Sequence, residues 1–282
     1  MTGALAVARP GSGAAGRRTA WWLAAAGAVL TVGLNIAYPL AGATGRDRLS
    51  VVTVLVFAAA SLAGAWAHGG PRTAAAVLVA GGGIGLVAEV LGVATGVPFG
   101  TYAYADSLGP KLAGVPLVVP LAWVMMTWPS WVVGSALAAR VPARRRRVVA
   151  WLASAWALAS WDLFLDPQMV DAGHWAWRTG GGLAAALPGI PGIPVSNDLG
   201  WLAVSLVLTG VLALVRLPGS TARSVPGPAA SLYLWTWAGG IVANAFFFGR
   251  PAVAVVAGLL MGTVAVPFAA RWVRTLRAGG GR

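Results

Sequence analysis

The sequence predicts an all-α integral membrane protein, a bundle of about eight transmembrane helices with both termini in the cytoplasm. Two observations lead to this prediction: charged residues are scarce, and long apolar runs recur along the chain. Apolar residues make up 58% of the 282 residues and charged residues 10%, whereas a soluble domain carries about 25% charged residues. The chain has no cysteine, so neither a disulfide framework nor a cysteine-based metal site can form.

Eight apolar runs reach, or nearly reach, the roughly 20 residues that a helix needs to cross a bilayer. They cover residues 20–41, 50–68, 73–94, 114–139, 148–165, 197–216, 229–248 and 251–272. The fifth run is the shortest, and only Gly249 and Arg250 separate the last two, so seven helices are the alternative. We expect residues 1–18 to form a disordered cytoplasmic tail, residues 19–275 a single transmembrane domain, and residues 276–282 a basic C-terminal tail.

The basic residues indicate the orientation of these helices. The net charge is +13, but the arginines form short clusters between apolar runs and no continuous basic face, which argues against a nucleic-acid partner. With the N-terminus inside, only five of the 20 Lys and Arg residues lie outside: Arg46, Arg48, Lys111, Arg178 and Arg250. This bias supports eight helices and a multi-pass protein of the cell membrane, in contact with membrane lipid.

Acidic residues converge on the outer side of this predicted topology. The stretch from Glu89 to Pro116 contains the only glutamate, the only lysine and two of the four tyrosines of the chain. Six of the seven acids lie at or above the outer membrane face, among them Glu89, Asp106, Asp162, Asp166 and Asp198. Because ionisable residues at membrane depth are costly, such a group predicts a functional site.

Glu89 continues a line of small residues formed by Gly81 and Gly85. Small residues four apart let two helices approach closely in a bilayer, so Glu89 should face protein and not lipid. Two interpretations follow. Glu89 makes a structural hydrogen bond to a neighbouring helix, or it is a carboxylic acid that donates a proton in a dry pocket.

Asp162 and Asp166 lie four residues apart and would share one face of a helix. The proline at position 167 disfavours a helical conformation at Asp166, so we expect the helix to end near that residue. Asp166 could then be an N-cap with proline at the first helical position. Alternatively, the two carboxyl groups share a proton.

Two further polar segments have simple structural interpretations. Ser196-Asn197-Asp198 before an apolar run has the pattern of a helix N-cap. His174, Trp175 and Trp177 follow the fifth run, where aromatic residues commonly form a belt at the membrane interface.

Three blocks of residues resemble the membrane carotenoid hydratases of the CruF type, the bisanhydrobacterioruberin or gamma-carotene 1',2'-hydratases. They read E-x-x-G-V-x-T-G-x-P-F-G-x-Y-x-Y-x-D-x-L-G-P-K from Glu89, W-D-L-x-L-D-P-Q-M-V from Trp161, and G-I-P-x-S-N-x-L-G-W from Gly192. The resemblance covers residues 81–205. It implies addition of water, without cofactor or metal, to the terminal 1,2 double bond of an acyclic carotenoid, and leaves room for other carotenoid-pathway enzymes as partners.

This implied chemistry gives each candidate residue a role. Protonation of a trisubstituted alkene needs an acid in a water-poor pocket, and the resulting tertiary cation is stabilised by aromatic faces. We expect Glu89 or Asp162 to donate the proton, and Asp106, Asp166 and Asn197 to act on the water. Substrate-binding residues would be Tyr102, Tyr104, Trp123, Trp161 and Trp201.

Three other functions compete with a hydratase. The Asp162-x-x-x-Asp166 spacing could hold Mg²⁺ on a diphosphate, as in an intramembrane prenyltransferase. A carotenoid cyclase shares the protonation step and differs in what captures the cation. A transporter or lipid-binding protein could use the same acids as a proton relay.

Overall fold

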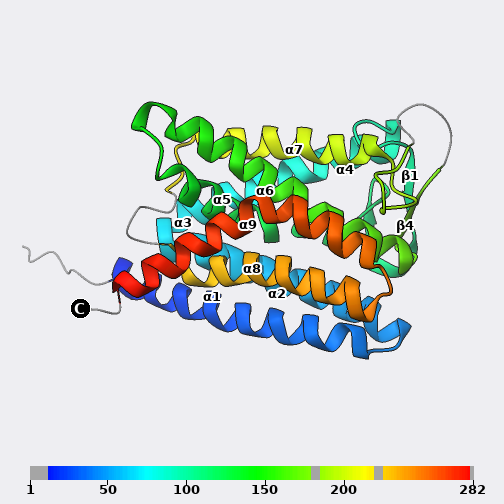
Figure 1. The fold of residues 1–282 in the computed structure, drawn as a ribbon, viewed down its shortest axis with the longest axis horizontal. Helices are drawn as coiled ribbons and strands as arrows, with labels where there is room; N and C mark the ends of the chain where they lie inside the picture. The colour runs from blue at the N-terminus through cyan, green and yellow to red at the C-terminus, as the bar shows by residue number, and fades with distance from the viewer. Residues whose placement is uncertain (1–11, 179–184, 219–224, 280–282) are drawn as a thin grey trace, which may run out of the picture.

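The computed structural model describes residues 12–178, 185–218 and 225–279. The helices are α1 (Ser12–Ala37), α2 (Ala43–Gly69), α3 (Pro71–Leu78), α4 (Gly85–Thr95), α5 (Val118–Ala138), α6 (Ala143–Asp171), α7 (Val195–Leu214), α8 (Gly227–Val242) and α9 (Pro251–Gly279). Two π-helical segments, η2 (Val79–Ile84) and η4 (Ala243–Phe247), join α3 to α4 and extend α8. The long helices lie side by side and form one bundle (Figure 1).

Seven helical segments in the described residues are long and apolar enough to cross a membrane. They are Gly13–Leu40, Ala43–Gly69, Pro71–Thr95, Val118–Ala138, Ala143–Asp171, Val195–Leu214 and Pro251–Arg277. The chain is therefore a multi-pass membrane protein built from helices. Helix α8 lies outside these seven but packs in the same bundle, against α1 and α9. The start of α1 and the end of α9 lie at the same end of the bundle (Figure 1).

Small residues bring the helices together. A Cβ atom added at Gly134 of α5 would lie 2.6 Å from the carbonyl oxygen of Ala150 on α6. Similarly, a Cβ atom at Gly81 would lie 3.0 Å from Cα of Val124, also on α5. Such close backbone approach is what stabilises helix pairs in lipid, where burial of apolar surface gives little driving force. As the Gly81 and Gly85 spacing predicts, Glu89 faces protein and is only 4% exposed.

Two helix ends differ from the sequence prediction. Helix α6 does not end near Asp166 but continues through Pro167 to Asp171, so Asp166 is not an N-cap. A proline removes one backbone donor, and a membrane helix tolerates this when neighbouring helices support it. The cap predicted at Ser196 or Asn197 is also wrong, because α7 begins at Val195 with Pro194 as its N-cap residue and no side-chain cap bond.

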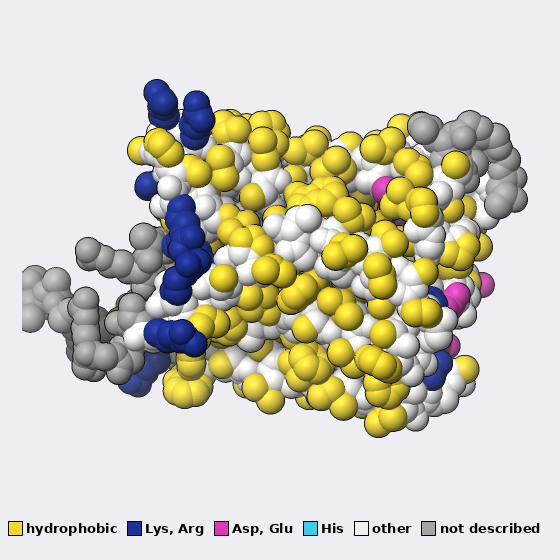
Figure 2. Space-filling view, in the orientation of Figure 1, with side chains coloured by type: hydrophobic (Ala, Val, Ile, Leu, Met, Phe, Trp, Pro, Cys, Tyr) yellow, Lys and Arg dark blue, Asp and Glu magenta, His cyan; other side chains and the backbone are white. Residues whose placement is uncertain are grey.

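Polar structure is concentrated at the two ends of the bundle. Lys and Arg side chains gather at one end, and the Asp and Glu side chains visible in Figure 2 lie towards the other. The acidic end carries two short antiparallel ribbons. Strand β1 (Tyr102–Tyr104) pairs with β4 (Trp175–Trp177), and β2 (Lys111–Leu112) pairs with β3 (Val115–Pro116). A 3₁₀ turn, Asp106–Leu108, separates β1 from β2.

Candidate active site

A cavity of about 210 Å³ lies inside the bundle. Its wall includes residues from α1, α2 and α8 as well as from α4 to α7 and both strands of the β1–β4 ribbon. Glu89, Asp166 and Asn197 line it, together with a large number of aromatic side chains. The cavity therefore brings an acidic group from α4, another from α6 and an amide from α7 to one apolar space.

Glu89 is held by three hydrogen-bond donors. Tyr102 and Tyr104 donate their hydroxyls to Oε2, at 2.6 and 2.7 Å, and the indole of Trp123 donates to Oε1 at 3.0 Å. The indole N–H can only donate, and a carboxyl group that receives three donors is best satisfied as the carboxylate. This geometry favours a negative charge on Glu89.

The two tyrosines remain donors at all ordinary pH values. Burial raises the pKa of both Tyr102 and Tyr104 above the usual value, and the neighbouring Glu89 raises each pKa further. A phenol beside a carboxylate cannot easily lose its proton, because that would place two negative charges in contact. The tyrosines therefore fix Glu89 in place without competing with it as acids.

Asp162 and Asp166 form a second polar group on α6. Both are almost fully buried, and the amide of Asn197 donates to Oδ2 of each, at 2.9 Å to Asp162 and 2.5 Å to Asp166. Because one amide nitrogen donates to both, the two carboxyl groups lie close together in a buried place. Two adjacent buried negative charges repel, so this arrangement favours one proton shared by the pair, whereas the donors around Glu89 favour a carboxylate.

Only Asp166 of this pair lines the cavity. Its Oδ1 accepts a hydrogen bond of 3.1 Å from the indole of Trp175, whereas Oδ1 of Asp162 has no partner in the described part of the chain. Asn197 thus holds the pair from α7 in place of the predicted helix cap. Of the two carboxyl groups, Asp166 is therefore the one that a molecule in the cavity can contact, and Asp162 lies behind it.

The β1–β4 ribbon connects the two acidic groups. Tyr104 pairs with Trp175 across the strands, and their rings meet edge to face at 5.5 Å between centroids. Because Tyr104 bonds Glu89 and Trp175 bonds Asp166, the pairing fixes the spacing of the two carboxyl groups. Strand periodicity puts Tyr102 and Tyr104 on one side of β1 and leaves Ala103 exposed between them.

Aromatic rings form much of the cavity wall. Trp123 and Trp201 stack with centroids 3.9 Å apart and an interplanar angle of 14°, and Trp161 meets Trp201 edge to face at 5.7 Å. The five residues predicted to bind substrate all line the cavity: Tyr102, Tyr104, Trp123, Trp161 and Trp201. The faces of such rings attract cations.

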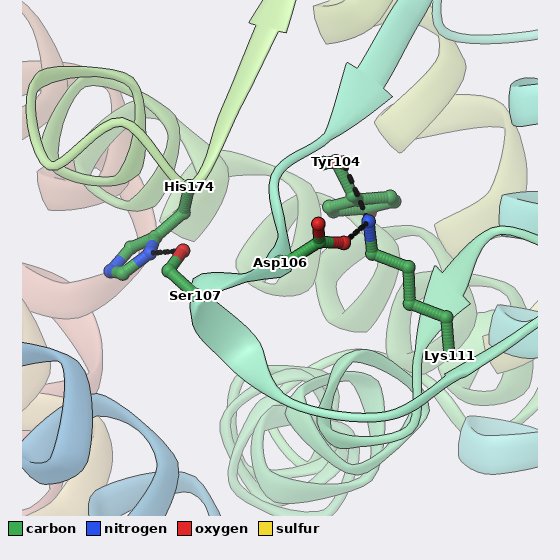
Figure 3. A network of polar contacts seen from close by, with 5 residues as sticks. All are labelled: Tyr104, Asp106, Ser107, Lys111 and His174. Carbon is green, nitrogen blue, oxygen red and sulfur yellow. Dashed lines mark hydrogen bonds and ion pairs between the residues drawn. The ribbon is translucent and has the colours of Figure 1, made fainter.

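Asp106 lies away from this group. Its side chain is 98% exposed and pairs with Lys111 at 2.7 Å, and the ammonium group also donates to the carbonyl of Tyr104 (Figure 3). The hydrogen bond and charge of Lys111 hold the pKa of Asp106 below its usual range. The structure thus brings together Glu89, Asp162, Asp166 and Asn197 and leaves Asp106 at the surface, so we assign it no part in the chemistry.

Sequence reasoning missed several cavity residues, among them Trp175 and Asn244. Trp175 was assigned to an interfacial belt, but the alternation W-A-W opposite Y-A-Y is the pattern of a paired ribbon. Asn244, in the π-helical segment after α8, gave no signal in the sequence. Within the described residues, no group of three or more His, Asp or Glu side chains is arranged to hold a metal ion.

Comparison with known proteins identifies the relatives of this chain. Residues 49–265 match the family model described as "Carotenoid biosynthesis protein". The chain belongs to this family. This carotenoid biosynthesis protein is also 32% identical over 116 residues to a bisanhydrobacterioruberin hydratase of Haloarcula japonica, which confirms the resemblance seen in the sequence. That match covers 40% of this chain and 36% of the relative, and no solved structure matches.

Proposed function

We propose that this protein is a carotenoid 1,2-hydratase, a hydro-lyase that adds water to the terminal double bond of an acyclic carotenoid. The observation that supports it best is the pairing of two acidic groups of opposite character in one aromatic cavity. Asp162 and Asp166 lie together on one amide donor, which favours a shared proton, and Glu89 receives three donors. The family and the named relative support the substrate class and the reaction type.

The first step is proton transfer from Asp166 to C2 of the alkene. Asp166 lines the cavity. The transfer leaves both carboxyl groups ionised until the proton returns, and the amide of Asn197, which donates to both, stabilises that added charge. Protonation at C2 leaves a tertiary cation at C1. The stacked indoles of Trp123 and Trp201 and the negative Glu89 stabilise that cation, each ring by about 0.5–2 kcal/mol.

In the second step water attacks C1 and gives up a proton to Glu89. The product is a tertiary alcohol, in which the new C–H hydrogen comes from the aspartate pair and the hydroxyl from water. Water in the cavity returns the proton from Glu89 to the aspartate pair, so both groups are restored and no net proton is consumed. This assignment makes Asp166 the acid and Glu89 the base.

We propose that the arginine-rich end of the bundle faces the cytoplasm and that α8 with η4 is an eighth crossing in the cell membrane. An even number of crossings fits a chain whose first described helix begins at the end of the bundle where its last described helix ends. The chain has no cysteine, so a single introduced cysteine is the only thiol that can react. A membrane-impermeant maleimide should label the variants Arg144→Cys and Asp106→Cys from opposite sides of the membrane. Labelling of both from the same side of intact cells would contradict the topology.

The proposed activity is tested by expression in a lycopene-producing host. We expect a product one water heavier than the substrate, and in deuterated water one non-exchangeable deuterium at C2. A product of unchanged mass would indicate a cyclase. Product formation that EDTA abolishes would indicate the Mg²⁺-dependent alternative.

A further inference from the structure

The cavity is closed around the acidic groups and reaches the surface on the other side of the bundle. Glu89, Asp166 and Asn197, which line it at the acidic groups, are at most 4% exposed. On the side of α1 and α8, Asn35 is exposed and Gly239 is partly exposed, although both line the same cavity. Helices α1, α2 and α8 lie together on the side of the bundle away from α4 and α7 (Figure 1). The cavity therefore crosses the bundle and opens beside α1 and α8.

The packing of α1 indicates which gap is open. A Cβ atom added at Gly27 of α1 would lie 2.8 Å from Cβ of Ala60 on α2, so these two helices are in close contact. Helix α1 packs less extensively against α8 than against α2. One face of α8 and the start of η4 line the cavity through residues that stay partly exposed: Trp235, Thr236, Gly239, Gly240 and Ala243. The opening therefore lies between α1 and α8.

The surface around this opening is apolar. Ile36 of α1 and Val242 of α8 are large, exposed hydrophobic residues next to the lining residues Asn35 and Ala243. Both α1 and α9, which flank α8, belong to segments long and apolar enough to cross a membrane. The opening thus faces the hydrocarbon part of the bilayer.

Aromatic rings close the cavity towards the loops. Tyr38, after α1, and Phe248, after η4, both line the cavity and meet edge to face with ring centroids 5.9 Å apart. The guanidinium groups of Arg46 and Arg250 lie over these rings, at 5.9 and 4.9 Å from the centroids. The charged groups therefore stay on the loop side of the ring pair, and the apolar opening lies on its other side.

The cavity is too small for a whole carotenoid. Its volume of about 210 Å³ lies below the roughly 300–1,000 Å³ of pockets that enclose a drug-sized ligand. An acyclic carotenoid is larger than such a ligand and about as long as the hydrocarbon core of a bilayer is thick, roughly 30 Å. Only one end of the molecule can therefore lie beside Glu89 and Asp166, and the rest of the chain must leave the cavity.

We propose that the gap between α1 and α8 is a slot for the polyene chain, through which the carotenoid extends from the cavity into lipid. This inference rests on the proposed function for the identity of the ligand. It makes Gly239 a specificity-determining residue, because the absence of a side chain there sets the width of the slot. The three atoms nearest to a Cβ added at Gly239 belong to Trp235 of the same helix, at 3.3–3.6 Å. A larger side chain would therefore extend into the slot.

Binding can be measured without turnover, because a bound polyene quenches tryptophan fluorescence. The protein is purified in detergent and titrated with an acyclic carotenoid. We expect Gly239→Phe to weaken binding about tenfold or more, because the ring occupies the space of the chain. Gly33→Phe is the matched control and should bind normally. Gly33 is exposed on α1, does not line the cavity, and has nothing within 4 Å of an added Cβ atom.

A second ligand tests whether the slot is open to the outside. It is the same carotenoid with a bulky pyrene group attached to one end. If the chain extends through the slot, the pyrene stays in the detergent, and the unaltered protein should bind both carotenoids with the same affinity per free end. A cavity that encloses the whole molecule would reject the pyrene.

Normal binding of the carotenoid to Gly239→Phe would overturn the inference, as would equal weakening in Gly33→Phe or rejection of the pyrene-bearing carotenoid. If Gly239→Phe does not fold, Ala243→Phe decides in its place, because Ala243 lines the same side of the cavity. Weakened binding there supports the slot, and normal binding contradicts it. Binding as expected without any hydrated product would overturn the proposed function alone. If the carotenoid does not quench the fluorescence of the unaltered protein, both fail.

Discussion

The proposed base is tested most sharply by Glu89→Gln. The new amide can turn its oxygen towards Trp123, whose N–H only donates, and its NH₂ group towards the two tyrosines. Tyrosine hydroxyls can rotate to accept, so all three contacts survive in reversed polarity and the site should stay folded. The substitution therefore removes the negative charge and the proton acceptor while preserving shape.

The expected loss follows from that missing acceptor. General bases contribute about 10²- to 10⁴-fold to rate, which corresponds to about 3–5 kcal/mol of transition-state free energy. We expect kcat of Glu89→Gln to fall by at least about 100-fold, with carotenoid binding by fluorescence quenching unchanged. The assay is product formation in membranes containing equal amounts of each variant.

Asp106→Asn provides the comparison, because Asp106 belongs to the same sequence block but is exposed and its side chain pairs with Lys111 at the surface. It should retain full activity. The reasoning is refuted if Glu89→Gln keeps more than about a tenth of the activity. It is equally refuted if Asp106→Asn loses as much as Glu89→Gln.

Three further predictions follow from other contacts. Trp123→Phe keeps an aromatic ring on Trp201 but removes the donor to Glu89, so kcat/KM should drop by about 10- to 100-fold without loss of folded protein. Gly134→Ala places a methyl group 2.5 Å from the backbone nitrogen of Ser154. It should lower the free energy of unfolding by about 1–3 kcal/mol or more. Thermal unfolding measures this loss, with Gly33→Ala as the control because nothing lies within 4 Å of an added Cβ atom there. Burial lowers the pKa of His174, although the charge of Asp47 opposes the shift. The unfolded chain therefore binds the proton more readily, stability falls as pH drops below about 6.5, and His174→Gln should flatten that dependence in pH-dependent melting curves.

Sequence patterns predicted where the site lies better than they predicted which residues belong to it. The spacing of Gly81 and Gly85 predicts that Glu89 faces another helix, because small residues at that interval let two helices pack closely. Asp106 has the same even spacing as Tyr102 and Tyr104, so strand periodicity alone would turn it inward. The strand ends at Tyr104, and the following 3₁₀ turn directs Asp106 to the surface.

Two other features depend on contacts between distant parts of the chain, which rules about neighbouring residues cannot predict. Pro167 disfavours a helix in its own neighbourhood, but α6 is buried between other helices at this point and continues to Asp171. Asn197 donates hydrogen bonds to two aspartates of α6 and does not cap the start of its own helix. The π-helical turn that presents Asn244 depends likewise on packing around α8.

The three-residue ribbon of β1 and β4 has a consequence for how this family can vary. Side chains alternate along a strand, so inserting or deleting one residue inside either strand would turn its aromatic rings to solvent and its alanine inward. Both strands would have to shift together to restore the arrangement. Evolution can therefore lengthen the loops that lead into the ribbon, and exchange Ala103 and Ala176, while the ribbon itself admits no change of length.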